Sequence, residues 1–575
     1  MNNLYYFPEA SVSDFSSLLE SFDEDDNMHE EEEERCQDGG SSASPEPKKR
    51  GSVHRKNVIT EKLVAALDKC KVSDRDAVHV ITAVAQALEF DIHTLSISRT
   101  TIQRCRQSLR REIAEKLKSY FKDISFTAPV VHWDSKLLSV LNESYMEDRL
   151  SIIITDGDIE QIIGIPVIPN SSGREQAHAV FEVLFDWDMA DKVKALCCDT
   201  TASNFGRING CCNILEQMLE RDLLYLPCRH HIYELVLKSA FDKLMPPSGG
   251  PDVPLFKRFK QSWSKIDSTK IKSPMEITSV QKIFKSDITE ILSFVDNILK
   301  THLPRHDYNE LLELTLLLLG RSYKVPVRAP GAVHHARWMA KAIYCLKIFL
   351  YRDQFHLTVS EETSISQLCI FIVKLYIKAW YTAPFAHLAP YHDLLFLKKI
   401  ILFKEINRDI ADAALLKFKN HMWYLSAEAS AFAFFDDNIP VNVKRNMVDA
   451  LKSDSLFGEA NKIEIDVRSN ILNLEISDFV SKHSKRFFER FNLPSNFLEQ
   501  DPQTWRINEQ YKHCLKIVEK IKVVNDAAER GIKLIQEYNS KLTKDEEQKN
   551  YIIQVVASYR KRFPDVSKAT ISSSF

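Results

Sequence analysis

The spacing of apolar positions changes its period along the chain. Residues 58–121 show helical spacing, about 128–228 contain short apolar runs typical of strands, and helical spacing returns from about residue 229. This order predicts an α/β region between helical regions, so the expected fold class is α/β plus α.

The α/β region contains apolar runs that predict one mixed five-stranded sheet, in which the first and fourth strands can lie adjacent and parallel. Asp134 follows the first run directly and Asp199 follows the fourth, so the two carboxylates are expected to meet at one edge of the sheet. The alternative is that each aspartate only caps the next helix. The runs are Val130–Trp133, Leu150–Thr155, Gln161–Val167, Val193–Cys198 and Leu223–Leu226.

The segment before the sheet predicts a small helical domain. Its expected helices are Glu61–Cys70, Asp74–Leu88 and Ser98–Tyr120, with Ser73 and Ser98 as N-caps. The third helix is rich in basic residues, which favours a DNA-binding surface over the alternative of a basic helix packed on the rest of the protein. The side chains expected to contact DNA include Arg104, Arg106, Arg110 and Arg111.

Composition narrows the class further. Only 14 of the 575 residues are glycine, well below the usual share of roughly 7%, which fits a mostly helical middle half. The 11 cysteines form no CxxC pair, as expected of reduced thiols. No signal peptide is evident and the apolar runs are too short to span a bilayer, so a soluble protein without membrane contact is expected.

The first 56 residues have the composition of a disordered tail. Nine of the twelve residues from Asp23 to Glu34 are acidic, and such a segment cannot bury enough apolar surface to fold. The basic clusters Lys48-Lys49-Arg50 and Arg55-Lys56 follow. They favour a nuclear localisation signal or a phosphate contact, and nuclear localisation is expected.

The order of several short motifs resembles the hAT family of DNA transposases. Asp199 opens a stretch that ends in Ser203-Asn204, Cys228 and His231 form a C-x-x-H motif, and Arg337-Trp338 matches the family's Arg-Trp motif. Further on, Ala528-Glu529-Arg530 is similar to the Ser-Glu-Arg start of the family's C-terminal helix. The resemblance covers about residues 128–565.

The resemblance implies an RNase H-like core interrupted by an all-α insertion. Asp134, Asp199 and Glu529 would be the catalytic carboxylates and would bind Mg²⁺ or Mn²⁺, since hard cations take oxygen ligands. Arg337 and Trp338 would contact DNA, and Cys228 and His231 would form a structural motif. The partners would be double-stranded DNA, at transposon ends and target, and further copies of the chain. The implied parts are 1–56 (acidic tail), 57–125 (small helical domain), 126–240 (first part of the core), 241–520 (insertion) and 521–575 (closing helix and dimerisation segment).

Several alternatives remain open at this stage. Glu428 and Asp526 compete with Glu529 as the third acid, and Cys228 with its neighbouring histidines, together with Cys211 and Cys212, is a weaker zinc candidate. Trp133 precedes Asp134 instead of following it, Ala527-Ala528 replace the usual serines, and no zinc finger is present. The chain is therefore either an active transposase, a domesticated descendant that binds DNA or protein without catalysis, or a helical scaffold whose acids are all caps.

Overall fold

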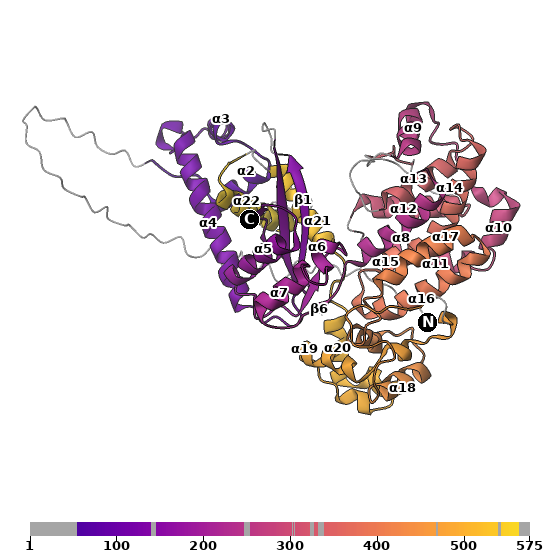
Figure 1. Cartoon of the computed structure of the whole chain (residues 1–575). Coiled ribbons are helices and arrows are strands. Elements are labelled where there is room, and N and C mark those ends of the chain that lie inside the picture. Colours follow the sequence, from indigo (N-terminus) through magenta and orange to yellow (C-terminus); the bar gives the residue numbers. More distant parts are fainter. Residues whose placement is uncertain are drawn as a thin grey trace, which may run out of the picture. The chain divides into compact units, whose positions relative to one another are not determined.

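The computed structural model describes two compact units (Figure 1). Its described residues are 55–139, 145–246, 253–301, 303, 305–321, 327–331, 339–466, 470–538 and 542–562. Within them, the first unit, here called the sheet unit, comprises 125–136 and 148–532. The second, the N-terminal unit, comprises 55–124, 137–147 and 533–562. The acidic tail and the cluster Lys48-Lys49-Arg50 lie outside the described residues.

A mixed sheet of six strands forms the α/β part of the chain. Its main path has the order β3-β2-β1-β5-β6, and the short β4 pairs with β2. The strand β1 pairs in parallel with β5, as expected for the first and fourth predicted runs. The bounds are β1 Val130–Ser139, β2 Met146–Asp156, β3 Ile159–Gly164, β4 Val167–Ile168, β5 Ala195–Cys197 and β6 Leu224–Tyr225.

Two features of the sheet differ from the sequence prediction. The third predicted run, Gln161–Val167, is divided between β3 and the two-residue β4, which gives the sixth strand. The strand β1 does not end at Trp133 but continues to Ser139. Asp134 therefore lies inside a strand and cannot be the cap of a following helix.

Helices on the sheet position the chain for the site described below. They are α5 (Gly173–Asp186), α6 (Ala202–Phe205), α7 (Cys211–Leu219) and α21 (Asp526–Tyr538), whereas α8 (Arg229–Leu244) packs against helices of the following all-helical part, chiefly α17. The helix α21 packs on β2 and β3 through Ala527 and Ala528, which contact Ile153 and Ile162.

A glycine in α21 sets how closely the helix approaches the sheet. A Cβ atom on Gly531 would lie 2.1 Å from the Ser151 hydroxyl oxygen of β2. A side chain at this position would force the Ser151 hydroxyl to move, so glycine allows the close packing of helix and sheet.

The residues between α8 and α21 contain, where described, helices and short 3₁₀ turns and no named strand, in agreement with the predicted all-α insertion.

A buried ion pair joins this insertion to the sheet region: the Arg229 guanidinium at the start of α8 bonds the Asp393 carboxylate of α16 at 2.6 Å. The Tyr233 hydroxyl donates to the same carboxylate at 2.8 Å, so both charges are satisfied in the interior. The helices of the insertion that the structure describes are α9 Pro254–Ser262, α10 Thr278–Phe284, α11 Ile288–Ile298, α12 His306–Leu318, α13 Ala340–Leu350, α14 Val359–Phe371, the π-helix Ile372–Tyr376, α15 Ile377–Thr382, α16 Ala389–Leu402, α17 Arg408–Phe418, α18 Val441–Ala450, α19 Lys485–Arg490 and α20 Glu509–Val518.

The N-terminal unit contains the three predicted helices and a fourth from the C-terminal part of the chain. They are α2 (Glu61–Lys69), α3 (Asp74–Ala87), α4 (Arg99–Asp123) and α22 (Glu546–Arg562). The helix α22 packs against α2 and α4, so part of the segment expected to serve dimerisation contacts the chain's own helices.

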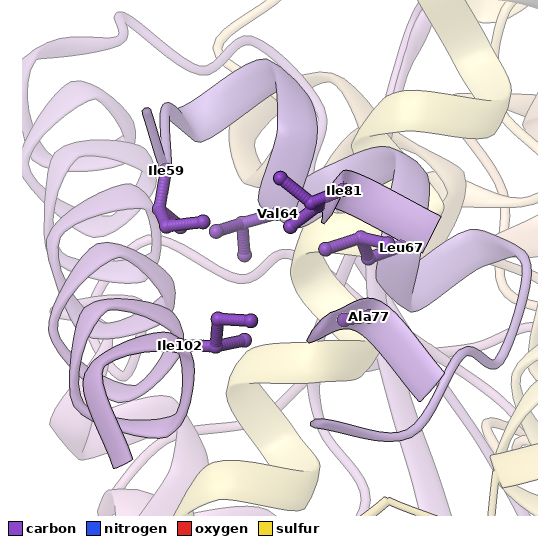
Figure 2. Close-up of a cluster of buried hydrophobic side chains, with 6 residues drawn as sticks. All are labelled: Ile59, Val64, Leu67, Ala77, Ile81 and Ile102. Atoms are coloured by element: carbon purple, nitrogen blue, oxygen red, sulfur yellow. The ribbon is translucent and has the colours of Figure 1, made fainter. Parts of the chain in front are cut away.

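Local signals at the helix starts are confirmed. The Ser73 hydroxyl accepts from the amide of Asp76 and the Ser98 hydroxyl accepts from the amide of Thr101, which are N-cap bonds. Figure 2 shows an apolar core of the N-terminal unit, formed by Ile59, Val64, Leu67, Ala77, Ile81 and Ile102.

Among the helices that the structure describes, none has both the length and the apolar composition needed to cross a bilayer.

Candidate functional site

The pairing of β1 with β5 brings Asp134 and Asp199 to the same level of the sheet. The last parallel pair is His132 with Cys197, and each aspartate lies two residues further along its own chain segment. Because side chains alternate with a period of two, both aspartates continue the face of that pair. The expectation that the two acids meet at one edge of the sheet is consistent with this register.

Short bonds from the loop after β5 fix the Asp199 carboxylate. Its Oδ1 accepts from the Thr201 amide at 3.1 Å and from the Thr201 hydroxyl at 2.6 Å. The Asn204 amide nitrogen donates to the same oxygen at 2.6 Å. Asp199 thus forms a turn with Thr201 but does not cap a helix, because the N-cap of α6 is Thr201 itself.

Two asparagines join Asp199 to β1 and α21. The Trp133 indole nitrogen donates to the Asn204 carbonyl oxygen at 2.9 Å, and the Asn525 side-chain amide donates to the Trp133 backbone carbonyl at 2.7 Å. From the sequence, Asn204 was included only as part of the motif that begins at Asp199, and Asn525 was not predicted to belong to the site. The signal that was available is the position of Asn525 directly before the helix that carries the third acid.

Glu529 reaches the site from the first turns of α21. Its carboxylate accepts from the Arg305 guanidinium at 2.9 Å, and Arg305 directly precedes α12. The expected placement of Glu529 on a helix packed against the sheet agrees with the structure, although 330 residues separate it from Asp199.

The two competing acids have other partners. The Glu428 carboxylate bonds the Arg490 guanidinium at 2.5 and 3.1 Å. The Asp526 carboxylate bonds the His230 ring at 3.0 Å and accepts from the Tyr308 hydroxyl at 2.9 Å. Neither acid is among the groups that perturb Asp134, so Glu529 is the best-placed third carboxylate.

Asp134 is the candidate carboxylate with the strongly raised pKa. Burial, followed by repulsion from the Asp199 and Glu529 carboxylates, raises the pKa of Asp134 to about 7. Burial also raises the pKa of Glu529, although the positive charge of Arg305 opposes the rise. Asp134 is therefore repelled by both other candidate carboxylates, whereas the acids that help to raise the pKa of Glu529 are Asp526 and Asp307.

The carboxylates fit a hard divalent cation in type but are not arranged as a ready metal site. Within the described ranges, no group of three histidine, cysteine, aspartate or glutamate side chains is placed to hold one ion. The Asp199 carboxylate bonds Thr201 and Asn204, and the Glu529 carboxylate bonds Arg305. Cation binding at Asp134, Asp199 and Glu529 would require these side chains to reorient.

Cys228 of the C-x-x-H motif is a hydrogen-bond acceptor at the start of α8. The buried Cys228 sulfur accepts from the Asn525 backbone amide at 3.2 Å, and the amides of His230 and His231 also bond to it. Burial lowers the pKa of His231, and the nearby charge of Asp199 opposes this effect. The zinc alternative has no support in the described part of the chain, where no suitable group of ligands is found.

The basic helix α4 does not present all four predicted arginines to solvent. Arg106 and Arg110 are buried, and their guanidinium groups bond the buried Asp68 carboxylate, for Arg110 at 2.8 and 2.7 Å. These two residues hold the helices together, so the prediction that they contact DNA is corrected. Arg104 and Arg111 are exposed.

The predicted DNA contacts Arg337 and Trp338 lie outside the described residues. Comparisons with protein-family models and with curated proteins find no match for this chain.

Proposed function

We propose that the chain is a hAT-like transposase that cleaves and joins DNA by metal-dependent phosphodiester chemistry. The observation that carries the proposal is the raised pKa of Asp134, which is due first to burial and then to the charges of Asp199 and Glu529. Acids that repel one another in this way occur where a cation is to be bound or a proton exchanged.

The arrangement of the sheet supports an RNase H-like core. Antiparallel β2 and β3 lie on one side of β1, and β5 and β6, parallel to β1 and to each other, lie on the other. The acids then come from the central strand, from the neighbouring parallel strand and from a helix that follows a long insertion. This is the order in which the family's three carboxylates are expected.

Each part of the chain would have a distinct task. When bound, a pair of Mg²⁺ or Mn²⁺ ions would stabilise the attacking and leaving oxygens of an in-line displacement. Asp134 and Asp199 would offer carboxylate oxygens from adjacent strands, and Glu529 would complete the set from α21. Asn204 would orient Asp199, and the exposed Arg104 and Arg111 of α4 would contact DNA phosphates.

The bonds that Asp199 and Glu529 already make favour a second candidate. A domesticated descendant that binds DNA or protein without catalysis would keep Asp199 on Asn204 and Glu529 on Arg305 as purely structural contacts. The third possibility, a scaffold whose acids are all caps, accounts less well for Asp134, which lies within a strand.

The test is a DNA cleavage and joining assay with the full chain. The purified protein is incubated with Mn²⁺ or Mg²⁺ and duplexes carrying the DNA that flanks its own gene. Nicked or joined products are expected from the wild type and from Glu428→Gln, but not from Asp199→Asn. Asparagine keeps the shape and the accepting oxygen of Asp199 but removes its charge, so the melting temperature should change little.

Two results would decide against this proposal. Absence of metal-dependent products from the wild type would favour the domesticated descendant. Products of equal yield from Asp199→Asn would place the chemistry elsewhere.

A further inference from the structure

Arg305 lies at the candidate site with a positive charge that none of the predictions included. Its Nη1 donates to Glu529 at 2.9 Å, and its Nε donates to the Asp307 carboxylate at 3.0 Å. The side chains of Arg305 and Glu529 are both largely shielded from solvent, with 28% and 29% exposed. The guanidinium also lies 5.8 Å from the centre of the Tyr308 ring, so its position is well defined.

The two carboxylates that hold Arg305 are not equivalent. Asp307 is only two residues away on the same segment and contacts the guanidinium through both of its oxygens. Glu529 supplies a further contact from α21. If Glu529 turned away, Arg305 would still be neutralised by Asp307, so the Glu529 contact can be broken without leaving an unpaired charge.

A guanidinium and a divalent cation would compete for the same Glu529 oxygen. We propose that Arg305 is a positioning residue that holds Glu529 while cations are absent and releases it when cations bind. The inference rests on the proposed function, because it assumes that Glu529 is a cation ligand. It also accounts for the finding that no three ligands in the described residues are poised for one ion.

The inference predicts that loss of the Arg305 charge strengthens cation binding. Mn²⁺ affinity of the full chain is measured by calorimetry without DNA, for the wild type, Arg305→Gln and the control Arg258→Gln. Arg258 carries the same charge and bonds Glu361 at 2.8 Å within the insertion, and it is not among the groups that perturb the site's acids. Arg305→Gln should bind Mn²⁺ roughly tenfold more tightly, since a positive charge a few ångströms from the ion is removed, and the control should match the wild type.

The possible outcomes separate the two proposals. If the wild type binds Mn²⁺, Asp199→Asn does not, and Arg305→Gln binds no more tightly than the wild type, the role of Arg305 is refuted while the proposed function stands. If neither the wild type nor Arg305→Gln binds Mn²⁺, both are refuted. Binding by Arg305→Gln alone would support Arg305 as the group that blocks the cation. Should Arg305→Gln fail to fold, Arg305→Met, which keeps the apolar stem, serves for the same measurement.

Discussion

Replacing Asp134 by asparagine should stabilise the cation-free protein at neutral and alkaline pH. The folded chain holds a proton on Asp134 up to a pKa of about 7, whereas the ordinary value is 3.8. Between these two values the folded state binds more protons than the unfolded state, so the free energy of unfolding falls as the pH rises through this window. The asparagine side chain in Asp134→Asn would carry no charge at any pH, so this variant would not show the loss.

The size of the effect follows from the change in pKa. A rise from 3.8 to about 7 corresponds to about 4 kcal/mol, at about 1.4 kcal/mol for each pKa unit. Asp134 is only partly buried, so solvent screening reduces the expected gain from Asp134→Asn to about 2 kcal/mol above pH 7. Near pH 4 the wild-type carboxyl is protonated in the folded state and about 40% protonated in the unfolded state, so the two proteins should differ far less than at pH 8.

Chemical denaturation at pH 4.5 and at pH 8 measures this difference. Asp188→Asn is the matched control, because Asp188 is an exposed carboxylate whose ion pair, with Lys192 four residues further on, is a surface contact at 3.0 Å. The gain in stability of Asp134→Asn over the wild type should be about four times as large at pH 8 as at pH 4.5, and the control should show no such change. A destabilised Asp134→Asn at pH 8 would mean that the Asp134 carboxylate has a favourable structural partner, and the reasoning on mutual repulsion would be wrong.

Two further predictions concern α4 and α21. Arg106→Ala should lower the free energy of unfolding by about 3 kcal/mol, because its buried carboxylate partner loses a charge contact. Joint replacement of Arg104 and Arg111 by alanine should leave stability nearly unchanged but flatten the salt dependence of DNA binding in a polarisation assay. An unchanged salt slope would exclude these two arginines from DNA contact. Gly531→Ala should destabilise the protein by about 1–3 kcal/mol, since its new Cβ would meet the Ser151 hydroxyl. In urea denaturation, the double variant with Ser151→Gly should recover part of this loss. Lack of any recovery would show that the clash is not the cause.

Much of the secondary structure could be predicted because its signals are local. The N-cap serines Ser73 and Ser98 are found where the sequence places them. The adjacent, parallel arrangement of β1 and β5 follows from the order of elements and the usual connection rules. The continuation of β1 to Ser139 was not predictable in this way, because the residues after Asp134 lack the apolar alternation that marks a strand.

Candidate site residues could be predicted only where residue type and local sequence are informative, and not where the role depends on a distant partner. Carboxylates directly after apolar runs are recognisable from sequence, so Asp134 and Asp199 could be predicted as candidates, although Asp134 lies within β1 and not at its end. Arg106 and Arg110 were assigned to a surface because a basic helix gives no local sign that Asp68, about 40 residues earlier, will bury two of its arginines. Arg305 was missed for a related reason, since its partner Glu529 is 224 residues away.

Asp134 is the residue that best separates a functional site from a structural one. Asp199, Asp526 and Glu529 each bond to polar side chains that a folded scaffold could use, namely Asn204, His230 and Arg305. For Asp134, the favourable influences are only the backbone amide of Ser135 and the charge of Lys136, and burial with two nearby carboxylates outweighs them. A carboxylate in this position lowers the stability of the cation-free chain, so its presence is explained better by a ligand than by the fold. The environment of Asp134 therefore favours the catalytic proposal over the hypothesis of a helical scaffold whose acids are all caps. No other acid of the site distinguishes these two hypotheses.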